Sequence, residues 1–166
     1  MTALRPRQSV RALAPDTSTS WCDNFFDFTG ATFDGGDFFG SHFRNFVYFG
    51  GATFSNGMVS FSRTAFSRGL VAFRGATFHG GHVDFSEAVF SGATVGFERA
   101  TFSGSTVTFG GAQFSGGTVQ FNNAEFSGGT VTFDGSTSSG GTVTFDGSTF
   151  SGSTIAWGPF PRPAGA

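Results

Sequence analysis

Residues 111–122 read Gly-Ala-Gln-Phe-Ser-Gly-Gly-Thr-Val-Gln-Phe-Asn, and this stretch decides the fold. Ala112 and Phe114 are two residues apart, as are Val119 and Phe121, and this spacing places both members of a pair on one face of a β-strand. The Ser-Gly-Gly-Thr between the pairs is rich in residues that turn a chain. The unit therefore predicts two short strands and two corners.

The same unit recurs every twelve residues from Val47 to Trp157. A short, fixed period with large apolar side chains in phase predicts a solenoid whose coils stack. Ser138 stands where the pattern calls for an aromatic residue, so we expect residues 134–141 to form the least stable layer. The branched column is Val47, Val59, Val71, Val83, Val95, Val107, Val119, Val131, Val143 and Ile155, the first aromatic column is Phe49, Phe61, Phe73, Phe85, Phe97, Phe109, Phe121, Phe133, Phe145 and Trp157, and the second is Phe54, Phe66, Phe78, Phe90, Phe102, Phe114, Phe126 and Phe150.

The composition is that of a folded chain without a strong electrostatic partner. The chain has 166 residues, 26 of them Phe, and a formal net charge of −2. Disordered phenylalanine-glycine chains that form meshes are the alternative, but they do not need a fixed phase. The small net charge predicts neither direct nucleic-acid binding nor membrane binding. Cys22 has no internal disulfide partner, and no apolar run is long enough for a signal peptide or a membrane span, so a cytoplasmic location is expected.

Two five-residue segments, Ala112-Gln113-Phe114-Ser115-Gly116 and Val119-Gln120-Phe121-Asn122-Asn123, resemble pentapeptide repeats separated by a two-residue insertion. The resemblance implies an all-β fold, a right-handed parallel β-helix or β-solenoid with four sides. It also implies that the central Phe of each repeat and the small residue two places earlier face inward. A pure five-residue spacing is kept earlier in the chain by Phe28, Phe33, Phe38 and Phe43.

The expected organisation is a single solenoid domain, residues 21–157, between two tails. Residues 21–26 would cap its start, and Trp157 with the proline-rich residues 158–166 would cap its end. Residues 1–20 contain three Arg and little apolar content, so they read as a flexible basic tail.

Two coil sizes remain open at this point. One unit per coil gives a flat twelve-residue roll, and two units give a 24-residue square coil closer to the family. Both coil sizes would bury the same columns of branched and aromatic residues. Thr53, Thr77 and Thr101 alternate with other residue types at the equivalent positions, which slightly favours the larger coil.

The repeat offers no catalytic, cofactor-binding or metal site, and an enzyme is not expected. His79, His82 and Asp84 have metal-ligand spacing but lack further ligands and a supporting shell. Residues 128–134 and 140–146 resemble the calcium-binding nonapeptide roll, but Val replaces its third glycine and the carboxylate comes one residue late. No Ser, His and acid set suggests a triad.

Two outward surfaces are candidate binding sites. Large apolar residues occupy outward positions of the first coils, and we interpret them as a protein-contact stripe: Phe46, Tyr48, Met58 and Leu70. Paired threonines flank the branched column later in the chain and resemble the ice-binding face of insect antifreeze solenoids: Thr106, Thr108, Thr130, Thr132, Thr142 and Thr144. Arginines are concentrated in the early units, and carboxylates in the later ones.

The leading functional hypothesis is a non-catalytic structural or protein-interaction scaffold, with a protein partner or self-association and no cofactor. Some members of the pentapeptide-repeat family resemble duplex DNA in shape and charge and bind type II topoisomerases, so a DNA-mimicking gyrase-binding protein is one alternative. An ice-binding protein that uses the Thr-x-Thr pairs is the other.

Overall fold

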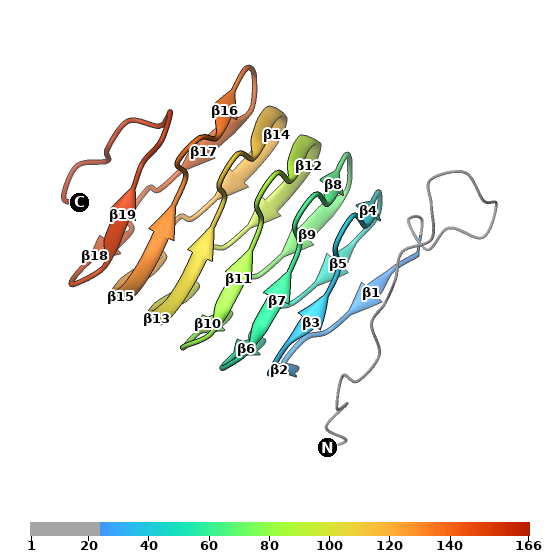
Figure 1. Cartoon of the computed structure of the whole chain (residues 1–166), viewed down its shortest axis with the longest axis horizontal. Coiled ribbons are helices and arrows are strands. Elements are labelled where there is room, and N and C mark those ends of the chain that lie inside the picture. Colours follow the sequence, from blue (N-terminus) through green and yellow to red (C-terminus); the bar gives the residue numbers. More distant parts are fainter. Residues whose placement is uncertain (1–23) are drawn as a thin grey trace.

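The computed structural model describes residues 24–166, which form a parallel β-solenoid with no helix in that part of the chain. Two sheets stack their strands along the axis of the rod (Figure 1). The predicted tail, residues 1–20, and Trp21, Cys22 and Asp23 of the predicted cap lie outside the described residues. Sheet A contains β1 (Phe26–Asp27), β4 (His42–Phe43), β5 (Val47–Tyr48), β8 (Ala65–Phe66), β9 (Leu70–Ala72), β12 (Val89–Gly96), β14 (Gln113–Gln120), β16 (Thr137–Ser138) and β17 (Thr142–Thr144). Sheet B contains β2 (Thr32–Phe33), β3 (Gly36–Asp37), β6 (Thr53–Phe54), β7 (Met58–Ser60), β10 (Thr77–Phe78), β11 (His82–Asp84), β13 (Thr101–Thr108), β15 (Glu125–Thr132), β18 (Thr149–Phe150) and β19 (Thr154–Ala156).

The strand register shows that one coil contains 24 residues. Val71 pairs with Val95, and Val95 pairs with Val119, each in parallel strands. Two twelve-residue units therefore make one turn, and successive units fall alternately on sheet A and sheet B. The first coil is shorter, because Phe26 pairs with Val47 across only 21 residues. This shorter coil coincides with the segment of pure five-residue spacing, which lacks the two-residue insertions.

Each 24-residue coil turns at tight corners between the sheets. In the coil of β12 and β13, the amide of Ala100 donates to the carbonyl of Phe97 at 3.1 Å, and Arg99 has a φ of 58°. A positive φ at the third position of such a turn is what a type II turn requires. Glycine occupies the same place at Gly51, Gly75, Gly111, Gly135 and Gly147.

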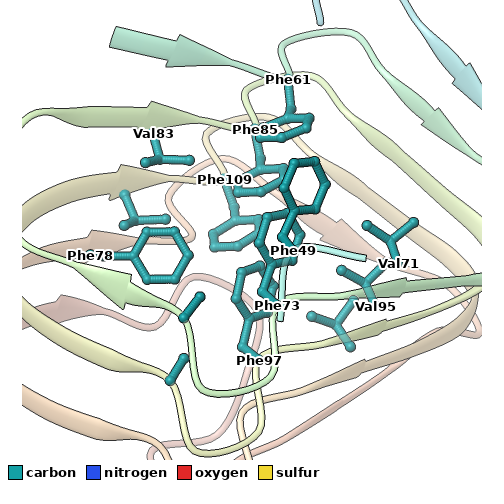
Figure 2. Close-up of a cluster of buried hydrophobic side chains, with 14 of the residues drawn as sticks. Phe49, Phe61, Val71, Phe73, Phe78, Val83, Phe85, Val95, Phe97 and Phe109 are labelled. Atoms are coloured by element: carbon teal, nitrogen blue, oxygen red, sulfur yellow. The ribbon is translucent and has the colours of Figure 1, made fainter. Parts of the chain in front are cut away.

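Phenylalanine rings fill the interior in four columns, in which equivalent rings of successive coils are stacked. Figure 2 shows two of these columns, one with Phe61, Phe85 and Phe109 and one with Phe49, Phe73 and Phe97. Phe85 lies 4.9 Å from Phe61 and 4.9 Å from Phe109, with ring planes 5° apart in both pairs. Phe73 and Phe97 stack at 4.7 Å in the facing column. The two columns meet edge to face, as in Phe85 and Phe97 at 87°. This geometry combines parallel stacking along the rod with T-shaped contacts across it, both favourable arrangements for aromatic pairs.

The inward positions predicted from the repeat are confirmed. Ala112 and Phe114 are buried, and so are Val119 and Phe121. Val71 and Val95 project into the same interior beside the rings (Figure 2).

The C-terminal segment covers the site of the missing ring at Ser138. Ser138 pairs in register with Phe114 but is itself exposed, so it leaves the end of that aromatic column open. The ring of Phe160 meets Phe114 edge-on at 5.0 Å and Phe133 at 5.3 Å. Its amide donates to the carbonyl of Trp157 at 3.0 Å, which holds the segment against the last coil. The defect predicted at Ser138 is thus covered by a ring from outside the repeat.

We expect Phe160→Ala to lower the free energy of unfolding by about 2 kcal/mol, because two stacked columns lose their covering ring. Denaturant unfolding measures the loss. Adding Ser138→Phe to the same variant should recover much of it, because the new ring would extend the column of Phe114. An unchanged stability in the single variant would contradict the capping role of Phe160.

A buried hydroxyl without a hydrogen-bond partner lies at Ser105, in the bend of β13. Ala93 occupies the equivalent bend of β12 and is equally buried. Since an unpaired buried hydroxyl costs free energy, Ser105→Ala should leave stability unchanged or raise it by up to about 1 kcal/mol. Ser136→Ala is the matched control, because the Ser136 hydroxyl donates to the carbonyl of Phe133 at 2.6 Å and its removal should destabilise the fold. Thermal unfolding of both variants gives the comparison.

Candidate functional site

The 24-residue coil divides the predicted apolar stripe between two faces. Phe46, Tyr48 and Leu70 belong to the strand columns of β5 and β9 on sheet A. Met58 begins β7 on sheet B and pairs with His82. The structure therefore brings three of the four residues together and places Met58 on the other sheet, where its side chain is 53% exposed.

Phe25 joins the three residues on sheet A, and these four side chains are here called the apolar patch: Phe25, Phe46, Tyr48 and Leu70. Tyr48 lies in the middle, with its ring 5.4 Å from Phe25 and 6.4 Å from Phe46. Phe25 is 56% exposed and Phe46 is 46% exposed, whereas Leu70 and Tyr48 are half-buried. Most Phe side chains of the solenoid are buried, so exposed rings at neighbouring positions distinguish this part of sheet A.

Three exposed arginines border the patch, and they are called the arginine rim: Arg44, Arg68 and Arg74. Arg44 and Arg68 lie in the bends that precede β5 and β9, and Arg74 follows β9 at the turn toward sheet B. The two bends stack closely, since a Cβ atom at Gly69 would overlap the carbonyl oxygen of Asn45. Positive charge therefore flanks the patch on both sides along the strand direction.

One exposed carboxylate, Asp27, lies at the N-terminal edge of the patch. It pairs in register with Tyr48. A hydrogen bond from Thr29 lowers the pKa of Asp27, so its carboxyl group stays ionised. Asp27 lies in the coil of β1, Tyr48 lies in the next coil, and β9 lies in the coil after that. The charge of Asp27 is therefore two coils away from β9.

Sheet B gathers threonines on its outer face. Thr106 pairs with Thr130, and Thr108 pairs with Thr132, so two predicted Thr-x-Thr pairs lie side by side. Thr130 continues the first ladder to Thr154, whereas Ala156 follows Thr132. A third ladder on the same sheet runs through Thr53, Thr77, Thr101, Glu125 and Thr149. The remaining predicted pair, Thr142 and Thr144, lies on sheet A, where Thr142 pairs with Thr118.

Comparison with known families matches residues 73–119 to the family model described as pentapeptide repeats (9 copies). The matched segment runs through the coils with the 24-residue register described above. The suspected resemblance to the pentapeptide-repeat family is thus confirmed over residues 73–119. The search of curated proteins gave no match. In this pentapeptide-repeat solenoid, the same parallel pairing continues outside the matched segment, to Val47 on one side and to Ile155 on the other.

An ion pair lies on the surface of the solenoid, away from the apolar patch. At one corner, Arg63 Nε donates to Glu87 Oε2 at 2.9 Å, and this hydrogen bond raises the pKa of Arg63. Its guanidinium also lies 5.8 Å from the ring centre of Phe39. Both charged side chains are more than half exposed, so the pair contributes little stability.

The histidines singled out by their spacing lie on either side of the Gly80-Gly81 bend between β10 and β11. His79 lies in a bend with Nδ1 3.1 Å from the hydroxyl oxygen of Ser103, and His82 and Asp84 are in β11. Within residues 24–166, no group of three or more His, Cys, Asp and Glu side chains could hold a metal ion. No helix in that range is long and apolar enough to cross a membrane.

Sequence reasoning placed two contributors within the expected caps, residues 21–26 and 158–166, but assigned neither ring a role. Phe25 belongs to the patch. Its only signal in the sequence was that it is aromatic and lies shortly before Phe28, where the five-residue spacing of Phe begins. Phe160 completes the core from the tail, and its signal was a single aromatic residue within a proline-rich segment.

Proposed function

We propose that this pentapeptide-repeat protein is a non-catalytic scaffold that binds another protein through the apolar patch on sheet A. The observation that carries the proposal is the exposure of Phe25 and Phe46 beside Tyr48. Contiguous exposed apolar side chains mark interaction sites more often than chance, and aromatic residues are enriched where binding energy is concentrated.

The support beneath the patch suits a binding role. Val47 and Val71 alternate with the patch residues and are buried in the core. The column of Phe49 and Phe73 lies directly beyond them, with rings 4.6 Å apart. A side chain presented by such a packed layer loses little conformational freedom on binding, so more of the contact energy remains as affinity.

Affinity capture from the native host with three matched baits tests this proposal. The wild-type protein and Met58→Thr should retain the same partner, because Met58 is an exposed apolar residue on the opposite sheet. The double variant Phe46→Thr/Leu70→Thr should lose it while keeping wild-type thermal stability. Identical captured proteins with all three baits would contradict a binding role for the patch.

The threonine ladders of sheet B support ice binding as a second candidate function. Adjacent coils are ~4.8 Å apart and alternate residues of one strand are ~6.8 Å apart. These two spacings resemble the repeat distances of water oxygens on the prism faces of ice. The in-register pairs of Thr106 with Thr130 and of Thr108 with Thr132 are the observation in its favour.

Thermal hysteresis measures ice binding directly. Glu125 interrupts the third ladder between Thr101 and Thr149, so Glu125→Thr should increase the hysteresis. Thr130→Glu should abolish it, and Thr118→Glu on the opposite sheet should not. Absence of hysteresis in the wild-type protein and in Glu125→Thr at millimolar concentration would exclude this candidate.

A DNA-mimicking role receives no support from the charges of the solenoid. Such a role depends on a strongly negative rod, whereas the chain has a net charge of −2. Glu87 is already paired with Arg63, and the arginine rim adds positive charge to sheet A.

A further inference from the structure

We propose that the two ends of the solenoid are complementary docking surfaces for a second copy of the chain, and that residues 161–166 block this contact. In the blocked contact, the first coil of one copy lies on the last coil of another, head to tail. The proposal goes beyond the proposed function, because it concerns the ends of the rod and does not use the apolar patch.

The C-terminal end of the rod carries two backbone donors that the earlier coils use. At the corner after sheet A, each coil donates two backbone hydrogen bonds to the next coil. The amide of Phe121 donates to the carbonyl of Thr144 at 2.8 Å, and the amide of Asn123, two residues later, donates to the last coil in the same way. The equivalent amides of the last coil, Phe145 and Gly147, donate no hydrogen bond within residues 24–166. They are directed toward the position that a further coil would take.

The N-terminal end of the rod carries the matching acceptors. Asp27 pairs in register with Tyr48, whose carbonyl accepts a hydrogen bond from the amide of Phe28 at 2.7 Å. The carbonyls of Asp27 and Thr29 hold the equivalent positions of the first coil, and they accept no hydrogen bond from the described residues. Unpaired backbone groups at a sheet edge are a template for another chain. Head-to-tail contact would continue both ladders, whereas contact between like ends would oppose donor to donor or acceptor to acceptor.

The side chains at the two ends are complementary in the same register. Phe28 stacks on Phe49 at 5.1 Å and begins the aromatic column that ends with Phe145. Head-to-tail contact would place Phe28 of one copy on Phe145 of the other and continue this column. The hydroxyl of Thr144 is buried and has no hydrogen-bond partner in the described part of the chain. The exposed carboxylate of Asp27 would lie beside it and supply an acceptor.

Residues 161–164 occupy the place that the second copy needs. Together with residues 143–147 they line a cavity of about 370 Å³, so they lie across this cavity from the amides of Phe145 and Gly147. Pro161 and Pro163 have no N–H group, and no backbone hydrogen bond among the described residues joins residues 161–164 to the last coil. Proline at a sheet edge prevents the addition of a strand. This segment therefore covers the docking surface without filling it or completing its ladder.

Sedimentation of the full chain and of a chain that ends at Phe160 tests the proposal. The full chain should sediment as a monomer. The shortened chain keeps Trp157 and Phe160, and its average mass should rise at least about twofold over a tenfold range of concentration, because a head-to-tail contact between rods does not close. Circular dichroism checks that it folds. The full-length variant Pro161→Gly/Pro163→Gly keeps every ring but has a more flexible segment, so it should assemble more weakly than the shortened chain.

Disulfides between copies identify the surfaces in contact. In a Cys22→Ser background, Asp27→Cys/Thr144→Cys places the two thiols of one chain five coils apart, about 24 Å, which is too far for a disulfide within the chain. Mild oxidation of the shortened chain should join copies into a ladder of linked oligomers. Met58→Cys/Thr144→Cys is the matched control, because Met58 is exposed on sheet B away from both ends, and it should give no ladder.

Three results would overturn the proposal. The first is a shortened chain that folds but stays monomeric, or, if that chain does not fold, a monomeric Pro161→Gly/Pro163→Gly variant. The second is a ladder of equal extent from both cysteine pairs, which would show contact that does not depend on the ends. The third is equal assembly of the full and the shortened chain, which would show that residues 161–166 block nothing.

Discussion

Replacing Phe109 with alanine should lower the free energy of unfolding by about 3 to 5 kcal/mol. Phe109 is fully buried and stacks on Phe85 at 4.9 Å and on Phe133 at 4.8 Å. It also meets Phe97 and Phe121 edge to face. The backbones of neighbouring coils are fixed by parallel hydrogen-bonded ladders, so they cannot move together to fill the space left by the ring. Denaturant unfolding followed by circular dichroism measures the loss.

Phe39→Ala is the matched control for this substitution. The Phe39 side chain is 51% exposed at a corner of the coil, so its removal should cost less than about 1 kcal/mol. Equal unfolding midpoints for Phe109→Ala and Phe39→Ala would contradict a core built from stacked rings.

Gly117→Ala should destabilise the solenoid by about 3 to 5 kcal/mol through backbone contact between coils. The strand register shifts at this bend, so that Gly92 and Ala93 of β12 face the single Gly117 of β14. Gly117 has a φ of +70°, and a Cβ atom there would overlap the carbonyl oxygen of Ala93. The alanine must therefore either change its backbone conformation or push two coils apart.

Gly111→Ala separates these two effects. Gly111 has a nearly identical φ of +67°, but its nearest neighbour would be the flexible side chain of Glu87 at 3.7 Å. This variant should lose only the roughly 1 to 2 kcal/mol that a left-handed backbone costs an alanine. If both variants lost the same stability in parallel unfolding experiments, close stacking of the bends would not be what requires glycine at position 117.

The period of the sequence was sufficient to predict which side chains face inward. Val119 and Phe121 are two residues apart, and two is the period of a strand, so burial of one determines burial of the other. The corner prediction was only partly right: turns do follow Phe97 and Phe109, but Ser115-Gly116-Gly117-Thr118 lies within β14, where the strand bends and its register shifts instead of ending. The family resemblance then supplied the parallel β-solenoid, which the structure confirms.

The size of the coil required information that the columns do not contain. A twelve-residue and a 24-residue coil bury the same Val and Phe columns, and the difference lies in which copy stacks on which. In the structure Phe97 stacks on Phe73 and Phe121, and it meets Phe85 and Phe109 edge to face. That alternation is a property of the three-dimensional packing. The role of Phe160 could not be predicted for the same reason, since its contact with Phe114 depends on how the C-terminal segment folds back onto the last coil.

The candidate site was predictable by residue type but not by grouping. Exposed apolar residues could be identified because they interrupt a polar position of the repeat. Their division between the sheets follows from the coil size, which separates Met58 from Phe46 and Leu70. The same division brings Thr106 beside Thr130 and removes Thr142 to the opposite sheet. Whether either surface binds a partner depends on complementary chemistry that no residue of this chain encodes alone.

Engineered disulfides test the 24-residue coil most directly. In a Cys22→Ser background, Thr106→Cys/Thr130→Cys places two thiols on paired positions of adjacent strands, about 4.8 Å apart at their backbones and within the range of a disulfide. Thr106→Cys/Thr118→Cys places them on opposite sheets. Mild oxidation followed by mass spectrometry should show complete crosslinking of the first pair and none within the second. Rapid crosslinking between positions 106 and 118, with positions 106 and 130 left reduced, would contradict the stacking on which the core and both candidate surfaces depend.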